Sequence, residues 1–220
     1  MIRLVIFDCD GVLVDTEPIA NRVLAEMVSA EGLPTTVAES MRRYMGRSMP
    51  AVIETIEAEL GRELGPTFAD EYYRRIFDAF DRELTEVPGA TDAVDAVERA
   101  GLAVCVASSG PHDKMRRTLG RTGLLSRFEG RIFSATEVAR GKPFPDLFLH
   151  AASRMEVEAG ECVVVEDSPA GVAAARAAGM RAIGLAGPLG AQALIDAGAE
   201  PIEQLGDLLE AIEGTRLTAP

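Results

Sequence analysis

Two carboxylates stand two residues apart at the end of an apolar run near the start of the chain. Leu4 to Phe7 is short, bulky and partly β-branched, which predicts a buried strand, and Asp8 and Asp10 follow it. Side chains alternate along an extended strand, so both acids can point the same way, and Gly11 then allows a sharp turn. Two acids so placed suit Mg²⁺ and acid–base chemistry on an anionic substrate. The alternative is a strand followed by an ordinary Asp-Gly turn.

Polar side chains recur at three later places, each after an apolar, strand-like run. They are Ser108, Lys142 in the loop Gly-Lys-Pro-Phe-Pro, and the pair Glu166 and Asp167. Each has an ordinary explanation, because serine and acidic residues cap helices and a lone lysine is usually solvated. In open parallel sheets, however, ligands bind at the carboxyl ends of the strands. The order of these groups therefore predicts that they meet beside Asp8.

The elements that must position these groups follow a regular alternation with one interruption. Apolar runs predict strands at 102–107, 132–133, 162–165 and 181–185, with helices between them, and only helical patterns appear between residues 17 and 86. This order predicts an α/β fold, a doubly wound, Rossmann-like parallel sheet with a small inserted all-helical domain. Residues 1–14 and 87–220 would form the catalytic core and 15–86 a helical cap. The first strand would lie centrally, because the strands that end at Ser108 and Asp167 must bring their ends beside Asp8.

Composition narrows the class of protein. Of the 220 residues, 22 are basic and 35 acidic, which gives a net charge of −13. Binding to nucleic acid through its backbone needs clustered Lys and Arg, so we expect no nucleic-acid partner. The start shows no signal peptide, and no apolar run is long enough to span a bilayer. The three cysteines lack metal-ligand spacing and are interpreted as reduced. We expect a cytoplasmic protein without a membrane partner.

Together the four polar segments resemble the motifs of the haloacid dehalogenase (HAD) superfamily. Residues 8–16 fit its first motif, Ser108 its second, 142–146 its third and 166–171 its fourth, in family order over essentially the whole chain. The resemblance is to the phosphatase branch with a helical C1 cap, which includes β-phosphoglucomutase and phosphoglycolate phosphatases. It implies a phosphoric monoester hydrolase with a Rossmann-like core.

The resemblance also implies a role for each motif residue. Asp8 would be the nucleophile that forms an aspartyl-phosphate, and Asp10 the acid and base. Ser108 would donate a hydrogen bond to a phosphoryl oxygen, and Lys142 would hold the phosphate and the Asp8 carboxylate together.

The same resemblance implies Mg²⁺ as the cofactor. Its ligands would be Asp8, the main-chain carbonyl of Asp10, and Asp167. Glu166 would act through water or as a further ligand.

Substrate contacts are expected from two places. Among the residues of the helical insertion, Arg47 is the leading candidate, because its planar fork suits anions, although a solvent-facing charge is the alternative. The candidate set in this insertion is Glu17, Asn21, Gly46 and Arg47, and after the second motif it is Ser109, Gly110 and Lys114.

The function expected from the resemblance is Mg²⁺-dependent hydrolysis of a small phosphorylated metabolite. Segments 77–84 and 109–115 are similar to bacterial 6-phosphogluconate phosphatase, which favours a sugar or sugar-acid phosphate such as 6-phosphogluconate. A β-phosphoglucomutase is one alternative, but Ala20 stands where the mutase carries a histidine. A catalytically silent binding protein on the same fold is the other. Because a cap alone can exclude water from the site, we expect a monomer.

Overall fold

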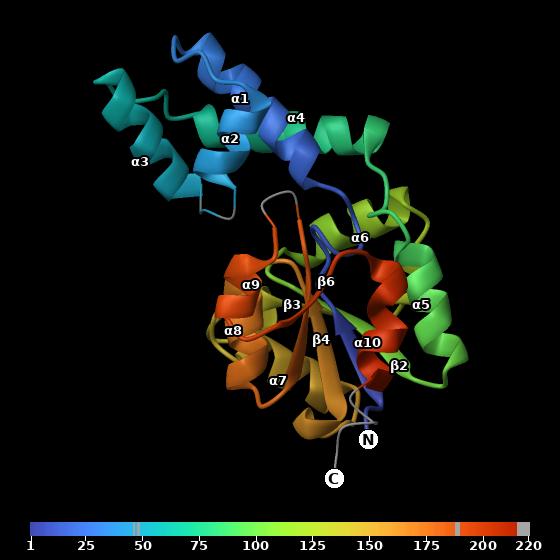
Figure 1. The fold of residues 1–220 in the computed structure, drawn as a ribbon. Helices are drawn as coiled ribbons and strands as arrows, with labels where there is room; N and C mark the ends of the chain where they lie inside the picture. Colours follow the sequence, from blue (N-terminus) through green and yellow to red (C-terminus); the bar gives the residue numbers. More distant parts are fainter. Residues whose placement is uncertain (46, 48, 188–189, 215–220) are drawn as a thin grey trace. The chain divides into compact units, whose positions relative to one another are not determined.

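The computed structural model describes residues 1–45, 47, 49–187 and 190–214. The chain divides into two compact units, one formed by Met1–Val14 with the chain from Thr85 onward, the other by Asp15–Leu84. Figure 1 shows the first unit as a sheet flanked by helices and the second as helices.

The first unit is built on a six-stranded parallel sheet in the order β3-β2-β1-β4-β5-β6. Leu4 on β1 pairs with Ala103 on one side and Cys162 on the other, so the first strand is central, as the sequence predicts. The whole of β1 is buried, which suits a parallel sheet covered on both faces. The strands are β1 (Leu4–Phe7), β2 (Ala103–Ser108), β3 (Ile132–Ser134), β4 (Cys162–Glu166), β5 (Arg181–Leu185) and β6 (Glu200–Ile202).

The edge strand β6 was missed by the sequence reading. It has three residues, Glu200, Pro201 and Ile202, of which only Ile202 is buried. A short strand that carries a proline and an exposed acid lacks the apolar run by which a buried strand is recognised, and both features are typical of sheet edges.

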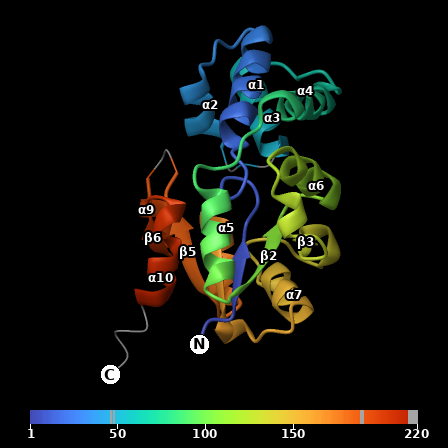
Figure 2. The same ribbon diagram turned by 90° about the vertical axis from the view of Figure 1, so that its right-hand side faces the viewer.

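Helices cover both faces of the sheet (Figure 2). On one face α7 and α8 pack on β1 to β5, over Leu4, Ile6 and Val164. On the other face α5 contacts β2 and α6 contacts β3, while Phe7 meets Phe128 edge to face. The helices of this unit are α5 (Ala90–Arg99), α6 (His112–Arg121), α7 (Asp146–Arg154), α8 (Pro169–Ala177), α9 (Gln192–Asp196) and α10 (Leu208–Gly214), with short 3₁₀ turns η1 (Leu125–Arg127), η2 (Ala135–Glu137), η3 (Ala159–Glu161) and η4 (Leu205–Asp207).

The described residues of the second unit form helices and no strand. They are α1 (Glu17–Ala30), α2 (Val37–Tyr44), α3 (Met49–Leu60) and α4 (Phe68–Glu83). Thr36 begins α2 with a capping box, in which it accepts the Glu39 N–H while the Glu39 carboxylate accepts the Thr36 N–H. A buried polar contact joins α1 to α2, because Ser40 Oγ donates to Asn21 Oδ1 at 2.9 Å. In the described part of the chain, no helix combines the length and apolar character that crossing a membrane requires.

Candidate active site

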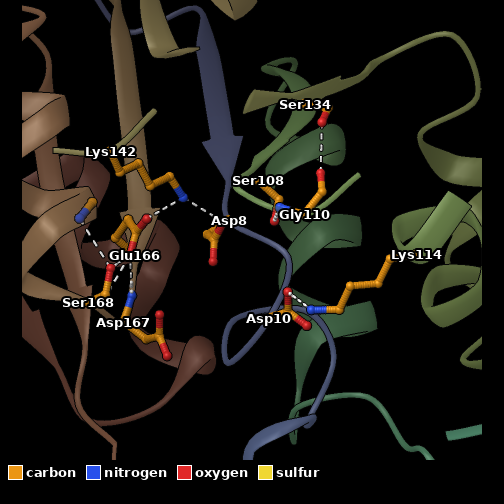
Figure 3. A network of polar contacts seen from close by, with 11 residues as sticks. Asp8, Asp10, Ser108, Gly110, Lys114, Ser134, Lys142, Glu166, Asp167 and Ser168 are labelled. Carbon is orange, nitrogen blue, oxygen red and sulfur yellow. Dashed lines mark hydrogen bonds and ion pairs between the residues drawn. The ribbon is translucent and has the colours of Figure 1, made fainter. Parts of the chain in front are cut away.

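The polar residues of the first unit meet where the parallel strands end. Asp8 directly follows β1, while Ser108, Ser134 and Glu166 are the last residues of β2, β3 and β4. The register aligns these ends, since Phe7 pairs with both Val106 and Val165, and Ser108 pairs with Ser134. This edge is where ligands bind in open α/β sheets. Figure 3 shows the resulting network.

Lys142 is the cation at the centre of this network. Its Nζ donates to Asp8 Oδ1 at 2.6 Å and to Glu166 Oε1 at 2.5 Å (Figure 3). The lysine side chain is only 7% exposed. Although burial lowers the pKa of its ammonium, the two carboxylates outweigh that effect and raise it above the usual range. Lys142 is therefore a buried, protonated bridge and not a solvated loop lysine.

Asp8 has an unusual charge balance. Burial raises the pKa of its carboxyl to about 7, Lys142 opposes this shift, and Glu166 adds to it. One ammonium shared between two buried carboxylates does not compensate fully for their loss of hydration. The site is thus short of positive charge around Asp8.

Glu166 is held by the start of the next helix. Its Oε2 accepts hydrogen bonds from the Asp167 N–H at 3.0 Å, the Ser168 N–H at 2.9 Å and Ser168 Oγ at 2.8 Å. A Cβ at Gly171 would collide with this carboxylate, so the glycine makes room for it. With Oε1 on Lys142, both oxygens of Glu166 are engaged, and the geometry makes Glu166 the anchor of Lys142.

One group of acidic side chains in the described residues has the spacing of a metal site. Single carboxylate oxygens of Asp8, Glu166 and Asp167 lie within 4.8 Å of one another. The Asp167 carboxylate packs against the backbone of Gly11, where a Cβ would collide with it. Oxygen ligands are what Mg²⁺ requires. The donor set therefore fits Mg²⁺.

The segment after β2 is folded back on Ser108. The Gly110 N–H donates to Ser108 Oγ at 3.2 Å, and Ser134 Oγ donates to the Gly110 carbonyl at 2.8 Å (Figure 3). Ser109 between them is exposed. Ser134 was not singled out from the sequence, although its place at the end of a strand could have identified it.

Glu137 connects the residues around Ser134 to the two neighbouring helices α6 and α7. It accepts the Ser134 N–H at 3.0 Å, and both histidines of the chain pair with it, His112 at 2.8 Å and His150 at 3.3 Å. His112 begins α6 and His150 lies on α7, so one carboxylate ties together the loops that follow β2 and β3 and the helix that follows Lys142. Both histidines are thereby engaged by Glu137, away from the Lys142 network.

We expect Ser134→Ala to loosen the segment of Ser108 to Gly110. The substitution leaves the half-buried Gly110 carbonyl without its donor, which costs about 1 kcal/mol of unfolding free energy. We expect KM for phosphate esters to rise more than kcat falls, measured by phosphate release, with thermal unfolding recorded beside it. Thr136→Ala is the control, because it removes a neighbouring hydroxyl that bonds to Ser134 and not to Gly110. An equal rise in KM in both variants would contradict this role.

Asp10 is engaged separately from the acidic cluster. Lys114 Nζ donates to Asp10 Oδ2 at 2.7 Å, and Figure 3 shows the Asp10 carboxylate directed to Lys114 while that of Asp8 is directed to Lys142. Lys114, which the sequence indicated only as a substrate contact, is thus the partner of the second aspartate.

The remaining candidates belong to the helical unit. Asn21 is buried, and its amide donates to the Glu17 carbonyl and carboxylate at 3.0 Å each, so this pair takes part in the internal structure of that unit. The guanidinium of Arg47 is exposed and donates to the carbonyls of Arg43 and Ala51. Gly46 lies outside the described residues.

The fold and the site together define the class of protein, which is an α/β enzyme with a carboxylate-rich site at the carboxyl ends of parallel strands. The chain belongs to the haloacid dehalogenase-like hydrolase family, which matches residues 2–179. It is 36% identical over 180 residues to the 6-phosphogluconate phosphatase of Escherichia coli strain K12, covering 81% of this chain and 80% of the relative. It is 32% identical over 215 residues to the phosphorylated carbohydrates phosphatase of Thermotoga maritima, covering 95% and 97%.

A solved structure supports the fold. The HAD family hydrolase of Deinococcus radiodurans, determined with bound phosphate and sodium, has a TM-score of 0.86 and 30% identity, covering 100% of this chain and 98% of that one. The family membership and the phosphatase relatives establish this chain as a phosphatase enzyme with a Rossmann-like core. The predicted fold class and enzyme class are confirmed.

Proposed function

We propose that the chain is a Mg²⁺-dependent phosphomonoester hydrolase that works through an aspartyl-phosphate on Asp8. The observation that carries the proposal is the Lys142 bridge between Asp8 and Glu166, beside an acidic cluster that fits a divalent cation. A binding protein has no need of a buried nucleophile, its lysine and a second aspartate in one site. The intact set therefore favours turnover over a silent binding role.

In the first step, the Asp8 carboxylate attacks phosphorus opposite the leaving oxygen. The new bond joins Asp8 to phosphorus, the bond from phosphorus to the leaving oxygen breaks, and Asp10 gives its proton to that oxygen. Lys142 offsets the negative charge that would otherwise repel the nucleophile from the phosphate. Ser108 Oγ and the backbone N–H groups around it donate hydrogen bonds to the phosphoryl oxygens.

In the second step, water replaces Asp8 on phosphorus. Asp10, now a carboxylate, removes a proton from the water as its oxygen bonds to phosphorus, and the bond between phosphorus and Asp8 breaks. Inorganic phosphate leaves, and both aspartates return to their starting protonation states.

Mg²⁺ would be held by Asp8, Asp167 and the main-chain carbonyl of Asp10, and when bound it neutralises charge on the phosphoryl oxygens. Glu166 contributes through Lys142, since its two oxygens already take four hydrogen bonds.

We expect Mg²⁺ to stabilise the protein more strongly as pH rises from about 5 to 8. The pKa of Asp8 is raised from 3.8 to about 7 in the metal-free protein. Its contribution to stability is thus fully present below pH 3.8 and is lost as pH rises to about 7. Mg²⁺ binds the ionised form and reverses that loss. Thermal unfolding with Mg²⁺ and with EDTA across this range measures the difference, and a Mg²⁺ effect that shrinks with rising pH would contradict it.

The substrate we propose is a sugar phosphate or sugar-acid phosphate, with 6-phosphogluconate as the first candidate. The support comes from relatives whose names specify 6-phosphogluconate and phosphorylated carbohydrates. The unit of residues 15–84 would serve as the substrate-selecting cap, with the exposed Arg47 as its anion contact. Ala20 disfavours mutase activity.

We also propose that the enzyme is a cytoplasmic monomer that does not bind nucleic acid. All three cysteines are free and buried, which suits a reducing compartment, and the net charge of −13 disfavours contact with phosphate backbones.

The test is phosphate release in Mg²⁺ from a panel of sugar phosphates, 6-phosphogluconate, phosphoglycolate and pyrophosphate, with Asp8→Asn as the blank. A single substrate well above the others would define the specificity and permit a test of Arg47→Ala, which should raise KM for that substrate more than for a small aryl phosphate. Isomerisation of β-glucose 1-phosphate without phosphate release would identify a mutase instead.

A further inference from the structure

Lysine is used in this chain at two positions only. Of the 22 basic residues, Lys114 and Lys142 are the two lysines and the remainder are arginines. Each lysine pairs with one aspartate of the first motif, Lys142 with Asp8 at 2.6 Å and Lys114 with Asp10 at 2.7 Å. A lysine ammonium is a compact charge on a flexible stem, whereas arginine needs room for a planar fork. The distribution therefore indicates that both positions serve the aspartates.

The pair of Lys114 and Asp10 is partly buried and well oriented. The two side chains are 24% and 23% exposed. Although burial lowers the pKa of the Lys114 ammonium, the Asp10 carboxylate outweighs it and holds the pKa above its usual range. A pair of this kind is stronger than a solvent-exposed ion pair, which holds its side chains loosely.

The surroundings of Lys114 fix its direction. Its stem passes over Gly110, where an added Cβ would lie 3.3 Å from Lys114 Cδ, so a larger residue at 110 would displace it. Its carbonyl accepts Thr118 Oγ1 at 3.1 Å one turn further along α6. Thr118 Oγ1 in turn lies 4.0 Å from the Sγ of Cys9, which is the residue between Asp8 and Asp10. Helix α6 is thereby packed on the first motif while its lysine reaches the second aspartate.

We propose that Lys114 is a positioning residue for Asp10, and that it orients the Asp10 carboxylate for proton transfer instead of binding the substrate. This inference rests on the proposed function, since it concerns the acid of that reaction. It differs from the sequence-based expectation that Lys114 contacts the phosphate or the leaving group.

The two roles predict different kinetics. A positioned acid matters most when the leaving oxygen is strongly basic, because such a group departs only with a proton. A phosphate contact is the same for every phosphate ester, so its loss lowers kcat/KM by the same factor for every substrate. The quantity that separates them is the dependence of kcat/KM on the pKa of the leaving alcohol or phenol, since kcat/KM reports the step in which that group departs.

The first experiment compares Lys114→Met with the wild type over a series of alkyl and aryl phosphates in Mg²⁺. We expect kcat/KM for alkyl phosphates to fall about 10²-fold and for acidic aryl phosphates only a few-fold. Lys114→Arg should restore part of the alkyl activity. Arg116→Met on the same helix is the matched control, because it also removes one positive charge and is exposed. An equal fall across the series in Lys114→Met would overturn the proposal.

The second experiment observes the lysines directly. Protein labelled with ¹³C only in lysine gives two Cε signals in the NMR spectrum, and Lys114→Met assigns them. We expect Asp10→Asn to move the Lys114 signal towards that of a solvated lysine and to leave Lys142 nearly in place, while Asp8→Asn moves mainly Lys142. If the chemical shift of the Lys114 signal does not change in Asp10→Asn, the proposal is overturned, and this result does not depend on any measurement of activity.

These readouts separate the present proposal from the proposed function. If the wild type releases no phosphate from any ester, the proposed function fails. The NMR experiment still tests the pairing of Lys114 with Asp10 independently of activity. If the wild type is active and Lys114→Met keeps the wild-type dependence on leaving-group pKa, the positioning role fails and the phosphatase assignment is untouched.

Discussion

Asp8→Asn is expected to lower kcat for phosphate release by roughly 10⁴-fold or more, because the proposed nucleophile is lost. An amide oxygen in its place is a poor nucleophile and a weaker partner for Lys142. The fold should persist, because the substitution removes a buried carboxylate whose ionised form is disfavoured, as its pKa of about 7 indicates. Phosphate release measures the loss, and thermal unfolding measures the stability.

The matched control is Asp113→Asn, which changes an exposed aspartate on α6 and should leave kcat unchanged. With stoichiometric enzyme, rapid acid quench of the wild type should also trap phosphate on the protein, and Asp8→Asn should trap none. Wild-type turnover in Asp8→Asn, or trapped phosphate that survives the substitution, would remove Asp8 from the nucleophile role.

The convergence of the site was predictable because it depends on topology. Asp8, Ser108 and Glu166 lie at the ends of apolar runs, and in a parallel sheet the ends of neighbouring strands must meet. The central place of β1 followed from the same requirement and is confirmed by its pairing with β2 and β4. Such features need only the period of the apolar pattern and the order of the elements.

The features that sequence reasoning missed depend on side-chain packing. Nothing in the residue types says that Lys114 turns to Asp10 rather than to a substrate, since that depends on how its stem packs over Gly110. The sequence also does not reveal that the Ser168 hydroxyl and N–H donate hydrogen bonds to Glu166, because a glutamate before a helix could as well be a metal ligand. Ser134 is the last residue of a strand of only three residues, whose apolar pattern is too short to draw attention to the residue at its end.

Lys142→Met should produce the largest loss of stability among these predictions. The methionine fills the space of the lysine stem against Phe148, but it leaves Asp8 and Glu166 without the cation between them. Removing one partner of a buried ion pair costs about 3–5 kcal/mol of unfolding free energy. Phosphate release should fall by about 10²–10³-fold, because the charge that offsets the approach of the phosphate is lost. Chemical unfolding at pH 7 and phosphate release measure the two effects.

The pH dependence and a double variant separate charge from packing. In Lys142→Met the buried Asp8 carboxyl, whose pKa is already raised, takes up a proton more readily in the folded state, so the loss of unfolding free energy should be small at pH 5 and grow towards pH 8. Adding Glu166→Gln removes one of the unpaired charges and should restore much of the stability but none of the activity. If the deficit is independent of pH, or if the double variant is no more stable than Lys142→Met, the loss arises from packing against Phe148. Lys142 would then not be the electrostatic link between the nucleophile and its anchor.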